Sequence, residues 1–269
     1  MMFNMSSPEL LEGLKKGPNI IIDGDILLFR GTVGAQHEIN WGGDAGVVTA
    51  HCSLPEVMAY VANYIKTITD DISEHFNWYG KYNIVLAFTG ESNFRKTMYP
   101  VYKANRNGRK KPIGYLQARE MLAKKYQCVI EEPLEADDIV GILATTYEHT
   151  LIVSGDKDFK TIPGHFYDFL KKTFYKTDIK KADYNVLYQT LLGDRTDNYE
   201  GLPKCGPITA EKILANNCSW AGVRDAYAAK GMSESHALMQ ARMAFILRAS
   251  HYNRITKKIR QWTPEDLSL

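Results

Sequence analysis

Four short apolar runs constrain the fold of this 269-residue chain most strongly. They cover residues 19–22, 83–88, 128–130 and 151–153, and each has the length of a strand that is buried on both faces. Segments with the periodicity of amphipathic helices separate them, for example residues 55–76. Strands that alternate with helices predict an α/β fold with a parallel sheet, in which functional side chains gather at the carboxyl ends of the strands.

The rest of the chain gives weaker signals. We expect a hairpin or two edge strands over residues 165–175 and a loop over residues 41–47, which contain three glycines. From residue 182 onward the pattern is helical, and residues 232–247 predict one of these helices. No flexible linker separates the two parts, so we expect an α/β domain over residues 1–181 with a helical region, residues 182–269, packed on it.

Composition places the chain among globular proteins. It is 45% apolar and 24% charged, and it has no apolar run of the length that a membrane span needs. Its four cysteines are scattered without a C-x-x-C pair, which argues against a structural zinc site and a disulfide framework. The first residues lack the apolar core of a signal peptide. We therefore expect a cytoplasmic protein with reduced thiols and no membrane partner.

The net charge of +2 conceals a strong local asymmetry. Residues 95–125 contain ten basic side chains and one acid, whereas residues 131–158 contain eight acids and one base. A basic segment followed by an acidic one suits a polyanion that is held by cations while metal ions act on its backbone. The alternative is an ordinary solvated basic loop.

Carboxylates follow the apolar runs and open one predicted helix. They are Asp23 and Asp25, Glu135, Asp137 and Asp138, Asp156 and Asp158, and Asp194 and Asp197. Acids near a helix N-terminus can simply complement its dipole. Their repetition at the ends of apolar segments instead suggests one pocket, and so many like charges need cations to neutralise them. We therefore predict a Mg²⁺ or Mn²⁺ site.

Five short motifs occur in one order over residues 20–215. They are Ile22-Asp23-Gly24-Asp25, Tyr102-Lys103-Ala104-Asn105-Arg106, Glu135-Ala136-Asp137-Asp138, Ser154-Gly155-Asp156-Lys157-Asp158-Phe159-Lys160 and Gly193-Asp194-Arg195-Thr196-Asp197-Asn198. With them the chain resembles the flap endonuclease and 5′→3′ exonuclease family, and most of all the exonucleases of short-tailed bacteriophages. Each motif is weak alone, but five in register are strong.

The resemblance implies a fold and an activity. The fold would be a PIN-like parallel sheet flanked by helices, with a C-terminal helix–hairpin–helix region. The activity would be Mg²⁺-dependent 5′→3′ exonuclease with structure-specific flap endonuclease or RNase H-like cleavage, in replication, recombination or primer removal. Two metal ions would act, Mn²⁺ could substitute, and no nucleotide cofactor is expected. Substrates would be DNA with 5′ ends or flaps and RNA–DNA hybrids, in the host cytoplasm if a phage encodes the chain.

The resemblance also implies site residues. The metal ligands would be Asp23, Glu135, Asp137, Asp138, Asp156, Asp158 and Asp197, with Asp194 as a ligand or an outer neighbour of the second ion. Lys103 and Arg106 would contact the scissile phosphate, unless they are ordinary exposed charges. The family usually has an aspartate where this chain has Gly90. Glu91 would replace it, or the site would lack one ligand.

Two further regions are expected to bind DNA. Residues 95–125 correspond to the family's arch or clamp, with Arg95, Lys96, Tyr102, Arg109, Lys110 and Lys111 as contacts; Tyr99, Tyr102 and Tyr115 either stack on bases or pack on the domain. The helix–hairpin–helix turn would offer Gly201 and Gly206 to phosphate, helped by Lys204 and Lys212. Lys204 and Cys205 depart from the family pattern there, which makes the family's K⁺ site doubtful.

Two alternatives remain open at this point. A phosphatase resembling the haloacid dehalogenase class would use Asp23 as nucleophile and Asp25 as general acid. It would leave the later acidic motifs and the basic segment unexplained. A non-catalytic protein that binds DNA structures would explain Gly90, but it would gain nothing from the other carboxylates.

Overall fold

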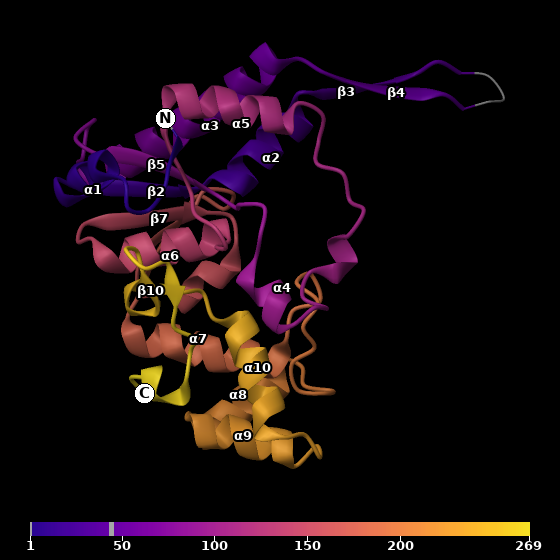
Figure 1. The fold of residues 1–269 in the computed structure, drawn as a ribbon, viewed down its shortest axis with the longest axis vertical. Helices are drawn as coiled ribbons and strands as arrows, with labels where there is room; N and C mark the ends of the chain where they lie inside the picture. The colour runs from indigo at the N-terminus through magenta and orange to yellow at the C-terminus, as the bar shows by residue number, and fades with distance from the viewer. Residues whose placement is uncertain (1, 43–45) are drawn as a thin grey trace.

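The computed structural model describes residues 2–42 and 46–269, and within them seven strands form one sheet in the order β1-β6-β5-β2-β7-β8-β9 (Figure 1). The strands are β1 Met2–Phe3, β2 Asn19–Asp23, β5 Asn83–Phe88, β6 Gln127–Ile130, β7 Thr150–Ser154, β8 Gly164–Asp168 and β9 Thr173–Thr177. Neighbouring strands are parallel, except that β9 pairs antiparallel with β8. The predicted parallel sheet and the predicted hairpin are therefore confirmed.

Helices cover both faces of the sheet because successive strand side chains point to opposite faces. Ile20 and Ile22 of β2 pack in one apolar cluster with α2 Gly24–Gly34, α3 Leu54–Phe76 and α5 Tyr115–Lys125. Ile21 packs in a second cluster with α1 Pro8–Lys15 and α6 Ala136–Thr146. This alternation buries both faces of β2, as its unbroken apolar run predicts.

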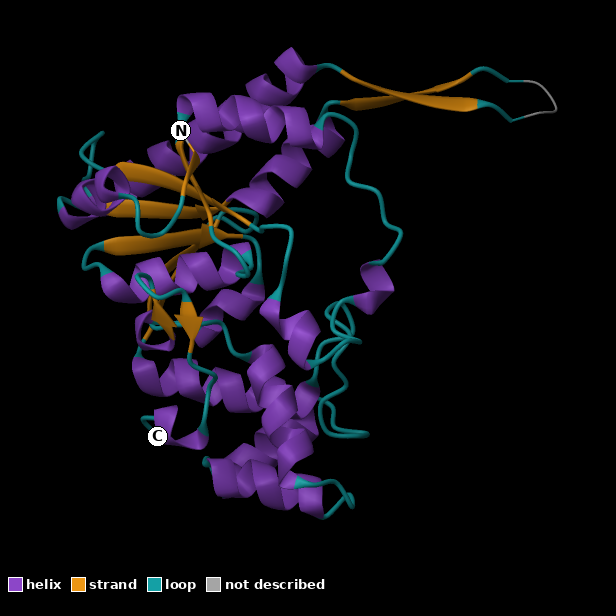
Figure 2. Ribbon diagram, in the orientation of Figure 1, coloured by secondary structure: helices purple, strands orange, loops and turns teal. Residues whose placement is uncertain are grey.

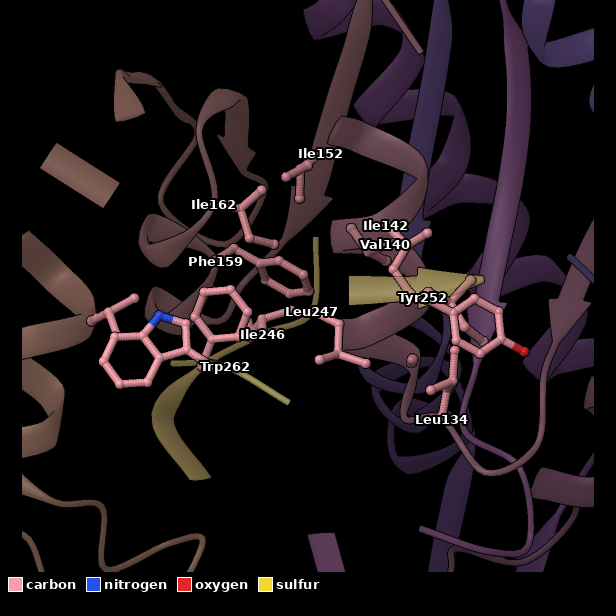
Figure 3. Close-up of a cluster of buried hydrophobic side chains, with 14 of the residues drawn as sticks. Leu134, Val140, Ile142, Ile152, Phe159, Ile162, Ile246, Leu247, Tyr252 and Trp262 are labelled. Atoms are coloured by element: carbon pink, nitrogen blue, oxygen red, sulfur yellow. The ribbon is translucent and has the colours of Figure 1, made fainter. Parts of the chain in front are cut away.

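The C-terminal helices continue the second cluster, which confirms that they pack on the sheet domain. They are α7 Ile179–Leu192, α8 Pro207–Asn216, α9 Trp220–Ala228 and α10 Glu234–Ala244. The elements η3 Ala249–His251, β10 Tyr252–Asn253, β11 Lys258–Ile259 and η4 Pro264–Asp266 follow. Figure 3 shows Ile246, Leu247 and Trp262 against Phe159 and Ile162. The boundary expected between residues 181 and 182 falls inside α7, and the division into an α/β domain and a helical region stays a prediction.

Residues 245–247 are extended, although the pattern predicted a helix up to residue 247. They cross α6 so closely that the Leu247 carbonyl oxygen lies 2.5 Å from where a Cβ on Gly141 would stand. A helix at this point could not bury Phe245, Ile246 and Leu247 together against α6. Tertiary packing therefore overrides the helical periodicity here.

A two-stranded ribbon was not predicted. Strands β3 Gln36–Asn40 and β4 Val48–Cys52 pair antiparallel between α2 and α3 and extend away from the body of the molecule (Figure 2). The loop expected over residues 41–47 connects them, and its residues 43–45 lie outside the described part of the chain. None of the helices in the described ranges is both long enough and apolar enough to cross a membrane.

Only part of the basic segment, residues 95–125, is free to form the expected arch, because the rest packs as a helix on the domain. It contains α4 Phe94–Met98 and η1 Ala104–Arg106, and its last part is α5, with Ala118 and Leu122 buried against the domain. The stretch between α4 and α5 runs along one side of the molecule, from beside α10 up to α5 (Figure 1). Residues 99–114 are therefore the part that is available as an arch or clamp.

Gly141 gives a test of the close packing on α6. A methyl group there would meet Leu247 O at 2.5 Å and Ile162 Cδ1 at 2.9 Å. We expect Gly141→Ala to lower the free energy of unfolding by about 2 kcal/mol in urea titrations, because overpacking outweighs the gain in helix propensity. Gly13→Ala is the matched control, since the nearest atom to a Cβ in α1 is 3.7 Å away. It should stabilise the protein by about 0.5–1 kcal/mol. A Gly141→Ala protein as stable as wild type would contradict this packing.

Candidate active site

Two strand ends bring the first carboxylates together. Asp23 ends β2 and caps α2, and its side chain accepts hydrogen bonds from the Ile26 N–H at 3.2 Å and from Ser154 Oγ at 2.9 Å. Ser154 ends the neighbouring parallel strand β7, and its Oγ accepts the Asp156 N–H at 3.0 Å. Ser154 thus ties Asp23 to the turn that carries Asp156. Ser154 was not among the predicted site residues, although its place before Asp156 and Asp158 in the chain is the signal that points to it.

Asp137 joins them from the first turn of α6. Burial and the charge of Asp23 raise the pKa of Asp137, while the Lys103 ammonium partly offsets them. Burial, then Asp25 and Asp156, raise the pKa of Asp23 to about 7. The negative charges of these carboxylates thus repel one another, because the protein around them screens charge poorly. We call Asp23, Asp137 and Asp156 the first carboxylate group.

A second carboxylate group consists of Asp158, Asp194 and Asp197. Burial and the charge of Asp156 raise the pKa of Asp158 to about 7, with Asp194 and Asp197 contributing. Gln189 of α7 donates to Asp158 Oδ1 at 2.7 Å, a contact that no sequence signal predicted. The Thr196 N–H donates to Asp194 Oδ1 at 2.6 Å, so the 194–197 turn holds its own acidic side chains in place.

A small cavity lies between the two groups. Its volume is about 20 Å³, which is room for one water-sized particle. Four carboxylates line it, namely Glu135, Asp137, Asp158 and Asp197. Three larger polar side chains, Arg95, Tyr102 and Tyr199, and a short apolar wall of Met243, Ala244 and Ile246 complete the lining. Residues that are 60 positions apart in the sequence, such as Asp137 and Asp197, therefore share one cavity.

The donor set fits a divalent cation by its chemistry. Burial and neighbouring carboxylates raise the pKa values of Asp23, Asp137 and Asp158, so a cation that neutralised these side chains would stabilise their ionised forms. Mg²⁺ and Mn²⁺ prefer carboxylate oxygens and water as ligands. Across residues 2–42 and 46–269, however, no three Asp, Glu, His or Cys side chains stand close enough to hold one ion between them. Binding an ion would therefore require these side chains to draw together.

The base of the 99–114 stretch lies against the carboxylates. Lys103 Nζ pairs with Glu135 Oε1 at 2.5 Å and lies 3.4 Å from Asp197 Oδ2, and Arg106 pairs with Asp197 Oδ1. Burial raises the pKa of Glu135, but Lys103 and Arg95 outweigh it and lower the pKa to about 2. Lys103 also has a left-handed backbone, with φ 54°, and its N–H donates to the Asp197 carbonyl at 2.8 Å. This strained position brings its ammonium into the site.

The structure gives two of the predicted site residues other partners than expected. Asp138 was expected to bind metal, but it is fully buried and both its oxygens accept from the Arg95 guanidinium, at 2.7 and 2.8 Å. Arg95 was expected to contact DNA, but it is 2% exposed and takes no part in the surface. The sequence shows an acid and a base, and cannot show that they pair across 43 positions.

Burial also gives Tyr102 and Gly201 other roles than the predicted DNA contacts, and it favours packing over stacking for Tyr115. Tyr102 and Tyr115 are each 3% exposed, so neither can stack on a base. Tyr102 donates to Glu135 Oε2 at 3.1 Å and Tyr115 donates to Asp25 Oδ1 at 2.6 Å. The buried Gly201 N–H donates to Gln240 Oε1 at 2.9 Å and is therefore taken, not offered to phosphate.

The Glu132 carboxylate occupies the space that an aspartate side chain at position 90 would need. A Cβ on Gly90 would stand 2.1 Å from Glu132 Oε1, and the Glu132 carboxylate accepts the Glu91 N–H at 2.5 Å. Glu91 itself is exposed. Among the described residues, the charges that act most strongly on Asp23 come from Asp25 and Asp156 and not from Glu91. The structure therefore gives Glu91 no place in either carboxylate group.

The remaining residues expected to contact DNA are exposed. They are Lys96, Arg109, Lys110, Lys111, Lys204, Gly206 and Lys212. Gly206 is the N-cap of α8, directly before Pro207, and no heavy atom lies within 4 Å of where its Cβ would be. The start of α8 is thus open to an approaching anion, as the helix dipole favours. Tyr99, the third tyrosine considered for stacking, is partly buried.

Comparisons with known proteins agree with this geometry. Residues 18–184 match the family model described as the 5′-3′ exonuclease, N-terminal resolvase-like domain. The exodeoxyribonuclease of Enterobacteria phage T3 is 32% identical over 95% of this chain and 96% of its own length. The exonuclease of Escherichia phage T7 is also 32% identical, over 95% of this chain and 97% of its own.

The solved structures give the same fold. The bacteriophage T5 D15 flap endonuclease, in a pseudo-enzyme-product complex with DNA and metal ions, aligns with a TM-score of 0.61 and 18% identity over 84% of this chain and 88% of its own. Its likeness supports the PIN-like sheet flanked by helices. The family model covers more than half of this chain, and two phage nucleases match nearly all of it. The chain therefore belongs to the 5′-3′ exonuclease family of nucleases.

Proposed function

We propose that the protein is a Mg²⁺-dependent 5′→3′ exonuclease with structure-specific flap endonuclease or RNase H-like activity, acting in DNA replication, recombination or primer removal. The observation that carries this proposal is the pair of carboxylate groups, buried at Asp23 and partly buried at the other five positions, beside Lys103 and Arg106. The T5 relative supports it, since its structure contains DNA and metal ions. A second T5 5′-exonuclease structure contains divalent zinc and aligns with a TM-score of 0.58.

In this proposal the carboxylates hold two Mg²⁺ ions, and Mn²⁺ can substitute. Asp23, Asp137 and Asp156 would serve the first ion, and Asp158, Asp194 and Asp197 the second, with Glu135 between them. When bound, the ions would supply a hydroxide nucleophile and stabilise the leaving oxygen of the phosphodiester. Lys103 and Arg106 now neutralise Glu135 and Asp197. With those carboxylates engaged in holding metal, Lys103 and Arg106 would be free to offset charge on the scissile phosphate.

The exposed cations would guide the substrate. Arg109, Lys110 and Lys111 lie in the 99–114 stretch, Lys204 precedes the open start of α8, and Lys212 lies in the second turn of that helix. These groups can contact phosphates but not identify bases, so binding would follow backbone and shape. DNA with 5′ ends or flaps is the proposed substrate, and RNA–DNA hybrids and a K⁺ ion at the 201–206 turn stay predictions. Its phage relatives suggest action in the cytoplasm of a bacterial host.

The phosphatase alternative does not survive the comparisons, because the chain belongs to a nuclease family. The structure agrees: Asp25, the supposed general acid, accepts hydrogen bonds from Tyr115 Oη at 2.6 Å and the Thr89 N–H at 3.0 Å. Both Asp25 contacts are thus inside the protein, where Asp25 accepts protein donors instead of facing a leaving group. The match to two phage exonucleases over 95% of the chain, together with the carboxylates at the site, favours an enzyme over the non-catalytic alternative.

Asp156 gives the first test, because its charge acts on both carboxylate groups. We expect Asp156→Ala to lower single-turnover cleavage of a 5′-flap duplex at least about 10³-fold, with the DNA Kd within about threefold of wild type. Product sizing on flap, nicked and blunt substrates, with Mg²⁺ and with EDTA, measures this and shows which substrate is preferred. Asp225→Asn, in an exposed ion pair with Arg224, is the control. Full activity of Asp156→Ala would remove the metal assignment.

Metal affinity should depend on pH. The pKa of Asp23 and of Asp158 is about 7 in the fold, above about 4 in the unfolded chain. The folded state thus holds protons that the unfolded state has lost, so without metal these groups reduce stability as pH rises from about 4 through 7. A cation must displace these protons, and its affinity should fall about tenfold per pH unit below 7 for each one. Mn²⁺ calorimetry between about pH 5.5 and 8 measures this. Constant affinity over that range would show that neither group is protonated where the ion binds.

Lys204 and Lys212 test the proposed DNA surface. Each phosphate contact contributes about 0.9 to the slope of log Kd against log salt, so Lys204→Ala with Lys212→Ala should reduce that slope by about 2. Cleavage at saturating DNA should stay at the wild-type rate, because neither lysine lies in the carboxylate groups. Lys15→Ala, an exposed lysine paired with Glu12 on α1, is the control. An unchanged slope in the double variant would place the duplex elsewhere.

A further inference from the structure

The buried pair of Arg95 and Asp138 is the strongest ionic contact near the site that the proposed chemistry does not use. Arg95 comes from α4 and Asp138 from the first turn of α6, and the guanidinium meets the carboxylate with two parallel hydrogen bonds of 2.7 and 2.8 Å. The side chains are 3% and 0% exposed. A planar guanidinium fork suits such a two-point contact, which a lysine ammonium cannot reproduce.

Asp138 has no free acceptor site. A carboxylate offers about four lone-pair positions. Besides the two bonds from Arg95, its oxygens accept the Leu247 N–H at 3.0 Å and the Glu135 N–H at 3.3 Å. A metal ion could bind Asp138 only by breaking one of these contacts inside the protein. The carboxylate is therefore saturated as it stands.

The same guanidinium reaches the site. Its Nη1 also donates to Glu135 Oε2 at 3.0 Å, and its Nη2 donates to the Phe245 carbonyl at 2.6 Å. Glu135 receives Lys103 Nζ on its other oxygen at 2.5 Å. Arg95 and Asp138 thus join three segments, namely α4, the first turn of α6 and the extended residues 245–247.

We propose that Arg95 and Asp138 form a positioning pair, which fixes Glu135 and Lys103 relative to the first carboxylate group without binding metal or DNA. This inference rests on the proposed nuclease function. The pair keeps the base of the 99–114 stretch, which carries Lys103, in register with the helix that carries Glu135 and Asp137. Loosening it lets Glu135 turn between Arg95 and Lys103, so the ligand and the phosphate contact no longer stand in their active arrangement.

Two conservative variants test the pair. Asp138→Asn keeps the shape of the side chain and loses its charge, and Arg95→Lys keeps the charge and loses the two-point contact. We expect each to slow single-turnover cleavage at saturating Mg²⁺ by about 10–100-fold, as changes to residues behind metal ligands do. The Kd for flap DNA, measured in EDTA, should stay within about threefold of wild type. Calorimetry with Mn²⁺ and no DNA should count the same number of ions in both variants as in wild type.

A second buried arginine–aspartate pair provides the matched control. Arg248 Nη2 donates to Asp183 Oδ1 at 2.8 Å, and the side chains are 9% and 2% exposed. Asp183→Asn and Arg248→Lys should lower Tm about as much as the Arg95 and Asp138 variants. Their cleavage rate at a temperature where all the proteins are folded should stay within about threefold of wild type. If Asp138→Asn does not fold, Arg95→Lys alone tests the pair, because a lysine at position 95 still provides a positive charge for the Asp138 carboxylate.

Three results would overturn the inference. One ion fewer in Asp138→Asn would make Asp138 a ligand. Cleavage at the wild-type rate in both variants would remove any positioning role, and equal slowing in the Asp183 and Arg248 variants would make the effect one of stability alone. A wild-type protein that does not cut DNA with Mg²⁺ would instead contradict the proposed function, and the Mn²⁺ count would still test whether Asp138 is a ligand.

Discussion

Buried and partly buried carboxylates near the carboxyl edge of a parallel sheet are the constraint on which the rest of the site depends. Asp23, Asp137 and Asp158 are held where burial and like charge both oppose ionisation, and their pKa values are raised. Such an arrangement costs stability in the folded protein unless protons or cations neutralise it. The proposed function turns this cost into a use, because several carboxylates together can bind a divalent cation more strongly than a single carboxylate can.

Cationic side chains of the protein itself neutralise part of the negative charge of the nearby carboxylates. Lys103 and Arg106 lie on Glu135 and Asp197, the two carboxylates nearest the base of the 99–114 stretch. Arg95 takes the charge of Asp138 deeper in the core. The side chains of Lys103 and Arg106 are 12% and 40% exposed, whereas that of Arg95 is 3% exposed. In the proposed mechanism Lys103 and Arg106 can therefore turn toward a phosphate, and Arg95 stays as a support behind them.

The sequence predicted the scaffold well and the partners of individual side chains poorly. Buried strands such as 83–88 have unambiguous patterns, and parallel order then places Asp23 and Asp156 at one edge of the sheet. Which partner Asp138 takes depends on Arg95, 43 positions away, and no local pattern records that pairing. Gly201 looked like a phosphate-binding glycine, but its φ of 68° and its packing against Gly193 explain why glycine is needed there. The ribbon of β3 and β4 was missed because its exposed residues have no buried face to make a pattern.

The central claim is that residues far apart in the chain surround shared divalent ions. Anomalous diffraction from crystals soaked in Mn²⁺ tests it most directly. We expect one peak among Asp23, Asp137 and Asp156, a second near Asp158 and Asp197, and none within coordination distance of Asp138. Ordered crystals in Mn²⁺ with no peak beside Asp23 and Asp156 would contradict it.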